Sequence, residues 1–91
     1  MTIQKRFEEF HANNPQIYEL IMRFIGEAKR RGFQNYTIKG IFERVRWHMN
    51  IETKGDVFKL NNNYTSRYVR KIEQDHPELA GFFRTRELIS E

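Results

Sequence analysis

The chain has 91 residues, a net charge of +4 and no cysteine. A chain of this length predicts a single domain over residues 1–91 with one modest hydrophobic core. The eight Phe, four Tyr and one Trp supply bulky core anchors and argue against disorder. The lack of cysteine excludes disulfides, thiolate metal sites and thiol nucleophiles. The basic charge favours an acidic partner.

The N-terminal third predicts two helices. Residues 2–11 form a short helical candidate, in which Ile3, Phe7 and Phe10 lie on one side. Asn14 and Pro15 then form a typical helix start, because Asn can cap free backbone amides and Pro fits the first helical position. The apolar residues that follow repeat at the spacing of one helical face, and Gly32 ends this helix at about residue 31.

A third helix is predicted over residues 38–49, with Thr37 as its cap. Gly40 weakens its first turn by about 1 kcal/mol relative to Ala, unless a close approach requires it. We expect the second and third helices to pack in one core with the helix that follows residue 63. The residues expected at this contact are Leu20, Phe24, Ile41, Phe42, Val45, Tyr68 and Ile72.

The pattern changes after Asn50. Residues 51–60 flank a turn-like Lys54-Gly55-Asp56 and predict a β-hairpin. A helix from Tyr64 to about Gln74, capped by Asn63, is expected next, then a short turn from Pro77 and a final strand over residues 84–89. The expected fold is therefore mainly α with a small β-hairpin (α+β), a single domain similar to a winged helix-turn-helix.

The most informative stretch for function is residues 59–71. Asn and Arg can make paired hydrogen bonds to base edges, and Ser, Thr and Lys commonly hold phosphates. For Asn63, a role as a helix cap is favoured over contact with a base. For Asn62, both roles stay open: the side chain can form a turn or contact a base. The candidate nucleic-acid-binding residues are Lys59, Asn62, Asn63, Thr65, Ser66, Arg67, Arg70 and Lys71.

Two assignments of a DNA-reading helix compete. In one, the helix from Ile38 is the reader and the 51–60 hairpin is a wing that brings Lys54 and Lys59 to phosphates. In the other, the helix from Tyr64 is the reader and residues 84–89 belong to a C-terminal wing. The second assignment is favoured, because Glu43 lies on the outer face of the helix from Ile38 and would repel phosphate.

Residues 53–68, followed by residues 76–83, resemble a family of small bacterial and prophage proteins without an assigned activity. The likeness covers most of the chain. It implies a bacterial or phage origin and no site residues. A cytoplasmic location is expected on other grounds, because the chain has no cysteine and carries no secretion or membrane signal. The N-terminus also lacks the apolar segment of a signal peptide, and no aliphatic run approaches the ~20 residues that span a bilayer.

The sequence contains no motif for catalysis or for binding a metal or another cofactor. His11, His48 and His76 are far apart and lack metal-ligand spacing, so neither a metal nor another cofactor is expected. Ser66 and Ser90 have no histidine nearby in the sequence, and the acidic residues form no close pair on a predicted pocket, since Glu8-Glu9 lies on a short surface helix. We therefore expect no enzyme. The aromatic residues Tyr36, Trp47, Tyr64 and Tyr68 could stack on unpaired bases, but their spacing with Val and Ile favours the core.

Two functions follow from these observations. The first is a small basic module that binds duplex DNA through the helix that starts near Asn63, for which sequence reading would usually need a two-fold homodimer. The second is a protein-interaction module, such as a phage adaptor or inhibitor, that meets an acidic protein and does not bind DNA. Neither function involves a membrane.

Overall fold

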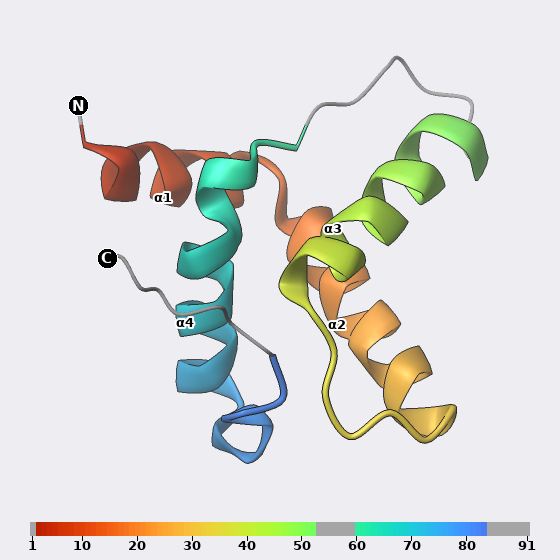
Figure 1. Cartoon of the computed structure of the whole chain (residues 1–91). Helices are drawn as coiled ribbons and strands as arrows, with labels where there is room; N and C mark the ends of the chain where they lie inside the picture. Colours follow the sequence, from red (N-terminus) through yellow and green to blue (C-terminus); the bar gives the residue numbers. More distant parts are fainter. Residues whose placement is uncertain (1, 53–59, 84–91) are drawn as a thin grey trace.

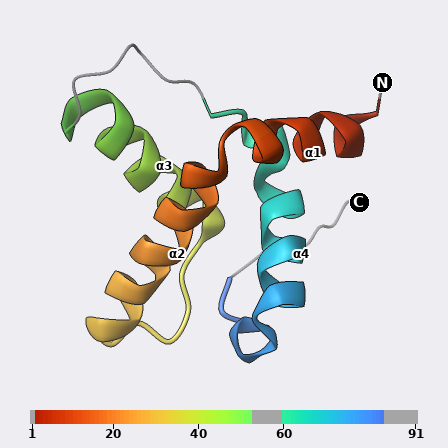
Figure 2. The same cartoon turned by 180° about the vertical axis from the view of Figure 1, so that it is seen from behind.

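The computed structural model describes residues 2–52 and 60–83, which fold as four α-helices. These are α1 (Ile3–Asn13), α2 (Pro15–Arg30), α3 (Ile38–Trp47) and α4 (Thr65–Asp75). α2 and α3 pack side by side, α4 stands opposite them, and α1 lies across the N-terminal end of α4 (Figures 1 and 2). Three shorter turns complete the described chain: a π-helical turn (His48–Glu52) and two 3-10 turns (Asn62–Tyr64 and Pro77–Leu79).

The ends of α2 and α3 are set by local chemistry. α2 stops before Gly32, whose φ of 96° is a left-handed conformation that side chains disfavour. The Phe33 amide then bonds back to the Ala28 carbonyl at 3.1 Å. Thr37 caps α3 as predicted, because its Oγ1 accepts a hydrogen bond from the Gly40 amide at 3.0 Å. The connection from Gly32 to Thr37 is therefore held at both ends.

The prediction that the Asn14 side chain caps α2 is wrong. Asn14 Nδ2 instead donates to the Phe10 carbonyl at 3.0 Å, and the Asn14 amide donates to the His11 carbonyl at 3.2 Å. The side chain thus closes the end of α1. With a single residue between the two helices, the asparagine serves the preceding carbonyls and Pro15 starts α2 without a donor.

The predicted core is confirmed. Phe42, Val45, Tyr68 and Ile72 are fully buried, Phe24 and Ile41 are 3% and 2% exposed, and all six belong to one hydrophobic cluster. Leu20 is half-buried and packs against that cluster from its edge. The Phe42 ring meets the Tyr68 ring edge-on, with 5.8 Å between centroids, so the core joins α3 to α4.

The predicted β-hairpin and the winged helix-turn-helix fold are wrong. Ile51 and Glu52, which should begin the first strand, continue α3 as a π-helical turn. Glu52 fixes this turn, because its carboxylate lies 2.8 Å from His48 Nδ1 and 3.3 Å from Arg44 Nη1. The described residues contain no strand, and their β pairing is a single bridge between Tyr36 and Phe83. The rest of the expected hairpin, residues 53–59, and the expected final strand, residues 84–89, lie outside the described residues.

The start of α4 also differs from the prediction. Asn61, rather than Asn63, supplies the capping oxygen, and its Oδ1 accepts from the Asn63 amide at 2.8 Å. A 3-10 turn over Asn62–Tyr64 then leads into α4 at Thr65. The predicted turn at Pro77 is confirmed as the 3-10 turn Pro77–Leu79. In the part of the chain that the structure describes, no helix is long and apolar enough to cross a membrane.

Candidate nucleic-acid interface

A polar groove of about 270 Å³ runs between α1 and α4. Each helix lines it with four side chains at helical three- and four-residue spacing. α1 contributes Gln4, Phe7, Glu8 and His11, and α4 contributes Arg67, Arg70, Lys71 and Gln74. Three of the four residues from α4 are therefore cations, whereas α1 contributes one acid.

The floor of this groove is aromatic and rigid. The Phe7 ring is 4% exposed and meets the Tyr68 ring edge-on, with 4.8 Å between centroids. The His11 ring stacks on Phe7 at 6.1 Å and faces the edge of Tyr18 at 5.4 Å. These contacts lock α1 against α2 and α4, because aromatic pairs add to the free energy of burial. The backbone on both sides of the groove is thus held in place.

The three cations of the groove differ in how far they are neutralised. Lys71 Nζ lies 3.1 Å from Asp75 Oδ2 and 5.3 Å from the centre of the Tyr18 ring. Arg67 and Arg70 form no ion pair with another described residue. Arg67 bonds weakly to Ser66 Oγ at 3.4 Å, and its Nε is buried without a hydrogen-bond partner in the described part of the chain. A buried donor without an acceptor is costly to the folded protein.

The α1 side of the groove adds little negative charge. Glu8, the acid among the lining residues, accepts a hydrogen bond from Gln4 Nε2 at 3.1 Å. Burial and the nearby charge of Lys71 lower the pKa of His11 below its usual value, which favours the neutral ring. His11 Nδ1 is also buried without a partner among the described residues. The groove therefore keeps a positive balance.

The arginines of α3, in contrast, are engaged. Arg46 Nη1 pairs with Glu43 at 2.9 Å, and Arg46 Nη2 donates to the Leu60 carbonyl and to Asn62 Oδ1, each at 2.6 Å. Arg44 stacks over the Phe24 ring and pairs with Glu52. Glu43 is exposed at the surface, so α3 offers neither free arginines nor an acid-free face.

Comparisons of the chain with protein-family models, with curated proteins and with solved structures find no significant match. They assign no family. The function proposed below rests on the geometry of the described residues.

The structure brings together part of the predicted site. Arg67, Arg70 and Lys71 share the groove, and Ser66 is exposed one residue before it. Thr65 faces the helix start, where its Oγ1 donates to the Asn62 carbonyl at 3.1 Å. Asn63 is exposed and is held through its backbone amide, whereas Lys59 lies outside the described residues.

Asn62 is assigned a structural role by its bond to Arg46. Replacing Asn62 by Ala should lower the free energy of unfolding by about 0.5–1.5 kcal/mol, because Arg46 loses an acceptor that ties α3 to the start of α4. Affinity for DNA per folded molecule should not change. Urea unfolding and a duplex titration measure the two quantities. Asn63→Ala is the matched control for the unfolding measurement, with a smaller loss of stability. Weaker DNA binding by folded Asn62→Ala would contradict this role.

Asp75 gives the protein a defined acid sensitivity. Hydrogen bonds from Tyr18 at 2.8 Å and from Lys71 lower the pKa of Asp75 below its usual 3.8. A lowered folded pKa stabilises the protein at neutral pH, and that contribution is lost as the pH falls through the lowered value. Tyr18→Phe should raise the pKa of Asp75 and move acid unfolding to higher pH, as measured by carboxyl NMR titration. An unchanged pKa in Tyr18→Phe would show that the hydrogen bond does not form in solution.

The histidines do not gather. His11 lies in the aromatic floor of the groove, His48 pairs with Glu52, and His76 lies 3.5 Å from Glu78. Among the described residues, no group of three or more His, Asp or Glu side chains could hold a metal ion.

The α1 half of the groove was not predicted from the sequence. Gln4, Glu8 and His11 repeat at four- and three-residue spacing beside Phe7, which is the signal of a shared helical face. That spacing identifies the face, and the crossing of α1 over α4 makes it one wall of a groove.

Proposed function

We propose that this chain is a small nucleic-acid-binding module that holds the phosphate backbone of duplex DNA against α4 and the groove between α4 and α1. The observation that carries the proposal is the convergence of Arg67, Arg70 and Lys71 on one groove, with the two arginines unpaired among the described residues. Phosphate contacts by Arg and Lys supply most of the affinity for any duplex.

The outer face of α4 supports the same proposal. Within α4, Arg67, Arg70 and Gln74 follow one another at intervals of three and four residues, so they form one stripe along the helix, and Asn63 lies in the 3-10 turn that precedes it. All four can donate hydrogen bonds to phosphates or base edges, and none is acidic. Glu73 lies next to this stripe, on the same side of the helix as Ser66. The stripe therefore has an acidic neighbour near its C-terminal end.

The burial of the aromatic residues favours duplex over single-stranded nucleic acid. Single-strand binders stack bases on exposed rings. Beside the groove, Phe7, Tyr64 and Tyr68 are 4%, 8% and 0% exposed, and their faces are covered by one another and by the core. Bases therefore have no ring to stack on there, whereas the phosphates of a duplex can reach the guanidinium groups.

A salt titration tests the function. Fluorescence anisotropy of a labelled mixed-sequence duplex should show binding at or below tens of micromolar protein in low salt. With three cations at phosphates, the logarithm of the affinity should fall with the logarithm of salt at a slope of about −2 to −3. No binding at tens of micromolar protein, or an affinity that is insensitive to salt, would contradict the proposal.

A further inference from the structure

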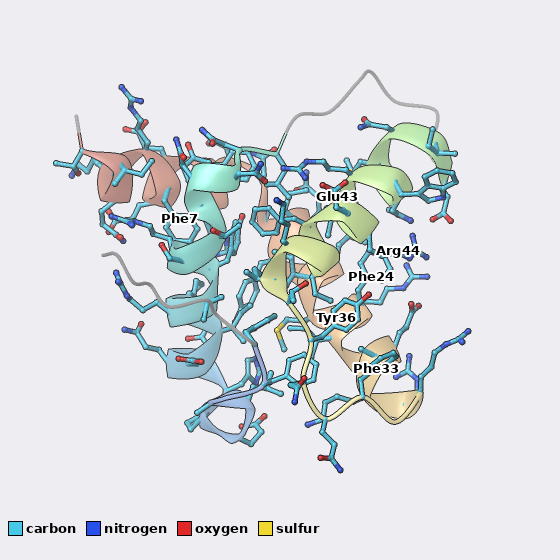
Figure 3. The ribbon with its side chains drawn as sticks, viewed as in Figure 1. Phe7, Phe24, Phe33, Tyr36, Glu43 and Arg44 are labelled. Carbon is cyan, nitrogen blue, oxygen red and sulfur yellow. The ribbon has the colours of Figure 1, made fainter. Side chains whose placement is uncertain are left out.

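A second hollow, of about 150 Å³, lies between the C-terminal half of α2 and the start of α3. Its apolar wall consists of Phe24 and Ala28 of α2, Ile41 of α3, and Phe33 and Tyr36 of the connection. Figure 3 shows Phe24, Phe33, Tyr36 and Arg44 on this side of the molecule, whereas Phe7 marks the groove on the other side. An apolar cavity of about 150 Å³ accepts a benzene ring, and pockets for drug-sized ligands begin at about 300 Å³. The hollow fits one side chain.

Phe33 remains half in solvent at the rim of this hollow. Its side chain is 49% exposed, and its ring meets Tyr36 edge-on with 5.3 Å between centroids. The hydrogen bond from the Phe33 amide to the Ala28 carbonyl, after the left-handed Gly32, holds the ring beside the end of α2. An exposed aromatic that is held in one place is typical of the anchors of protein interfaces.

Gly40 keeps the Tyr36 wall in position. A Cβ atom at Gly40 would lie 2.8 Å from Cε2 of the Tyr36 ring, which is too close for the ring to stay where it is. The same glycine lines the hollow. The glycine that weakens the first turn of α3 therefore allows the close approach that shapes the hollow.

The rim carries more positive than negative charge. Arg31 is exposed and forms no ion pair with another described residue. Arg44 lies 4.3 Å above the Phe24 ring, and its charge is partly balanced by Glu52 at 3.3 Å. The acid at this rim is Glu27, and its Oε2 forms an ion pair with Arg23 Nε at 3.9 Å. Lys29 and Arg30 precede Arg31 and are exposed as well. A partner that brings carboxylates is thus favoured over a basic one.

We propose that this hollow docks a protein partner by accepting one aromatic or branched aliphatic side chain that is flanked by acidic residues. The apolar wall and the volume select one side chain, and Arg31, which forms no ion pair with another described residue, selects an acidic neighbour. The site lies on the far side from the α1–α4 groove, so it does not depend on the DNA-binding function.

Peptide titration observed by NMR tests this docking. The probe is a short capped peptide in which one phenylalanine stands between glutamates on both sides. The amide signals of Tyr36, Gly40 and Ile41 should shift with saturating behaviour. The same peptide with alanine in place of phenylalanine, or with lysines in place of glutamates, should bind about tenfold more weakly, which corresponds to about 1.4 kcal/mol.

Variants of the protein locate the contact. Phe33→Ala removes an exposed ring and Gly40→Ala displaces Tyr36, and each should weaken peptide binding about tenfold or more. Trp47→Ala is the matched control, because Trp47 is another exposed aromatic, at 56%, that does not line the hollow. Circular dichroism verifies that each variant is folded.

Four results would overturn the proposal. Equal binding of the alanine peptide would show attraction by charge alone. Unchanged affinity in folded Phe33→Ala would place the contact elsewhere, as would amide shifts confined to the α1–α4 groove. Shifts at the hollow with a single-stranded oligonucleotide, and none with the phenylalanine peptide, would make it a site for a nucleic-acid base.

Discussion

Replacing Phe42 by Ala should lower the free energy of unfolding by about 3–5 kcal/mol. Phe42 is fully buried, and its ring lies edge-on to Tyr68, so truncation leaves a cavity between α3 and α4. Domains of this kind are stable by about 5–15 kcal/mol, and the loss is therefore a large share of the total. Urea unfolding followed by far-ultraviolet circular dichroism measures it.

Phe33→Ala is the matched control for this prediction. The same substitution at a side chain that is 49% exposed removes much less buried apolar surface, so the loss should stay near 1 kcal/mol. Similar losses at the two positions would contradict the packing described for α3. Phe24→Ala, at a ring that is 3% exposed, should fall in the range of Phe42.

The helices could be predicted because their apolar residues repeat at helical spacing and their ends carry local signals. Thr37 and Gly32 act within one turn of the chain, and each has the role that its residue type predicts. Asn14 shows the limit of this reasoning. The same amide side chain can serve the helix before it or the helix after it, and the backbone between α1 and α2 selects the former.

The β-hairpin was predicted wrongly because a turn-like Lys54-Gly55-Asp56 between two short flanking segments is a weak signal. Ile51-Glu52-Thr53 alternates as a strand would, but Glu52 also lies four residues after His48. That spacing suits a helical pair, and the contact with Arg44, eight residues earlier, reinforces it. Side-chain pairing with the preceding helix therefore overrides the local β pattern at Ile51 and Glu52.

The candidate site was predicted on α4 and missed on α1. The arginines of α4 are visible as an acid-free stripe in one segment of sequence. The wall from α1 depends on how Phe7 crosses Tyr68, a contact between residues far apart in the chain. The role of Asn62 likewise depends on Arg46, which approaches from α3. Contacts of this kind are tertiary and have no local signature.

The double variant Arg67→Ala/Arg70→Ala should nearly abolish duplex binding. Each arginine contributes about 1–3 kcal/mol if it reads a base and less if it meets only phosphate. Loss of two phosphate contacts should also reduce the salt slope by about 2. Anisotropy titrations over a range of salt concentrations measure the affinity and the slope together.

The control is Lys29→Ala/Arg30→Ala, which removes the same charge from the exposed end of α2, away from the groove. If the groove is the interface, this variant should keep nearly the full salt slope, because charges beyond ~10 Å are largely screened at 0.1 M salt. Equal weakening of both double variants would instead show a general attraction of the basic protein to DNA.

The single variants then separate base reading from phosphate contact. Arg67 has a buried Nε inside the groove, so Arg67→Ala should weaken all duplex sequences by similar factors, as the loss of a phosphate contact does. Arg70 lines the same groove but is more exposed than Arg67 and can reach a base edge, so Arg70→Ala should weaken some sequences more than others. Unchanged affinity in both folded single variants would exclude α4 as the DNA-contacting helix.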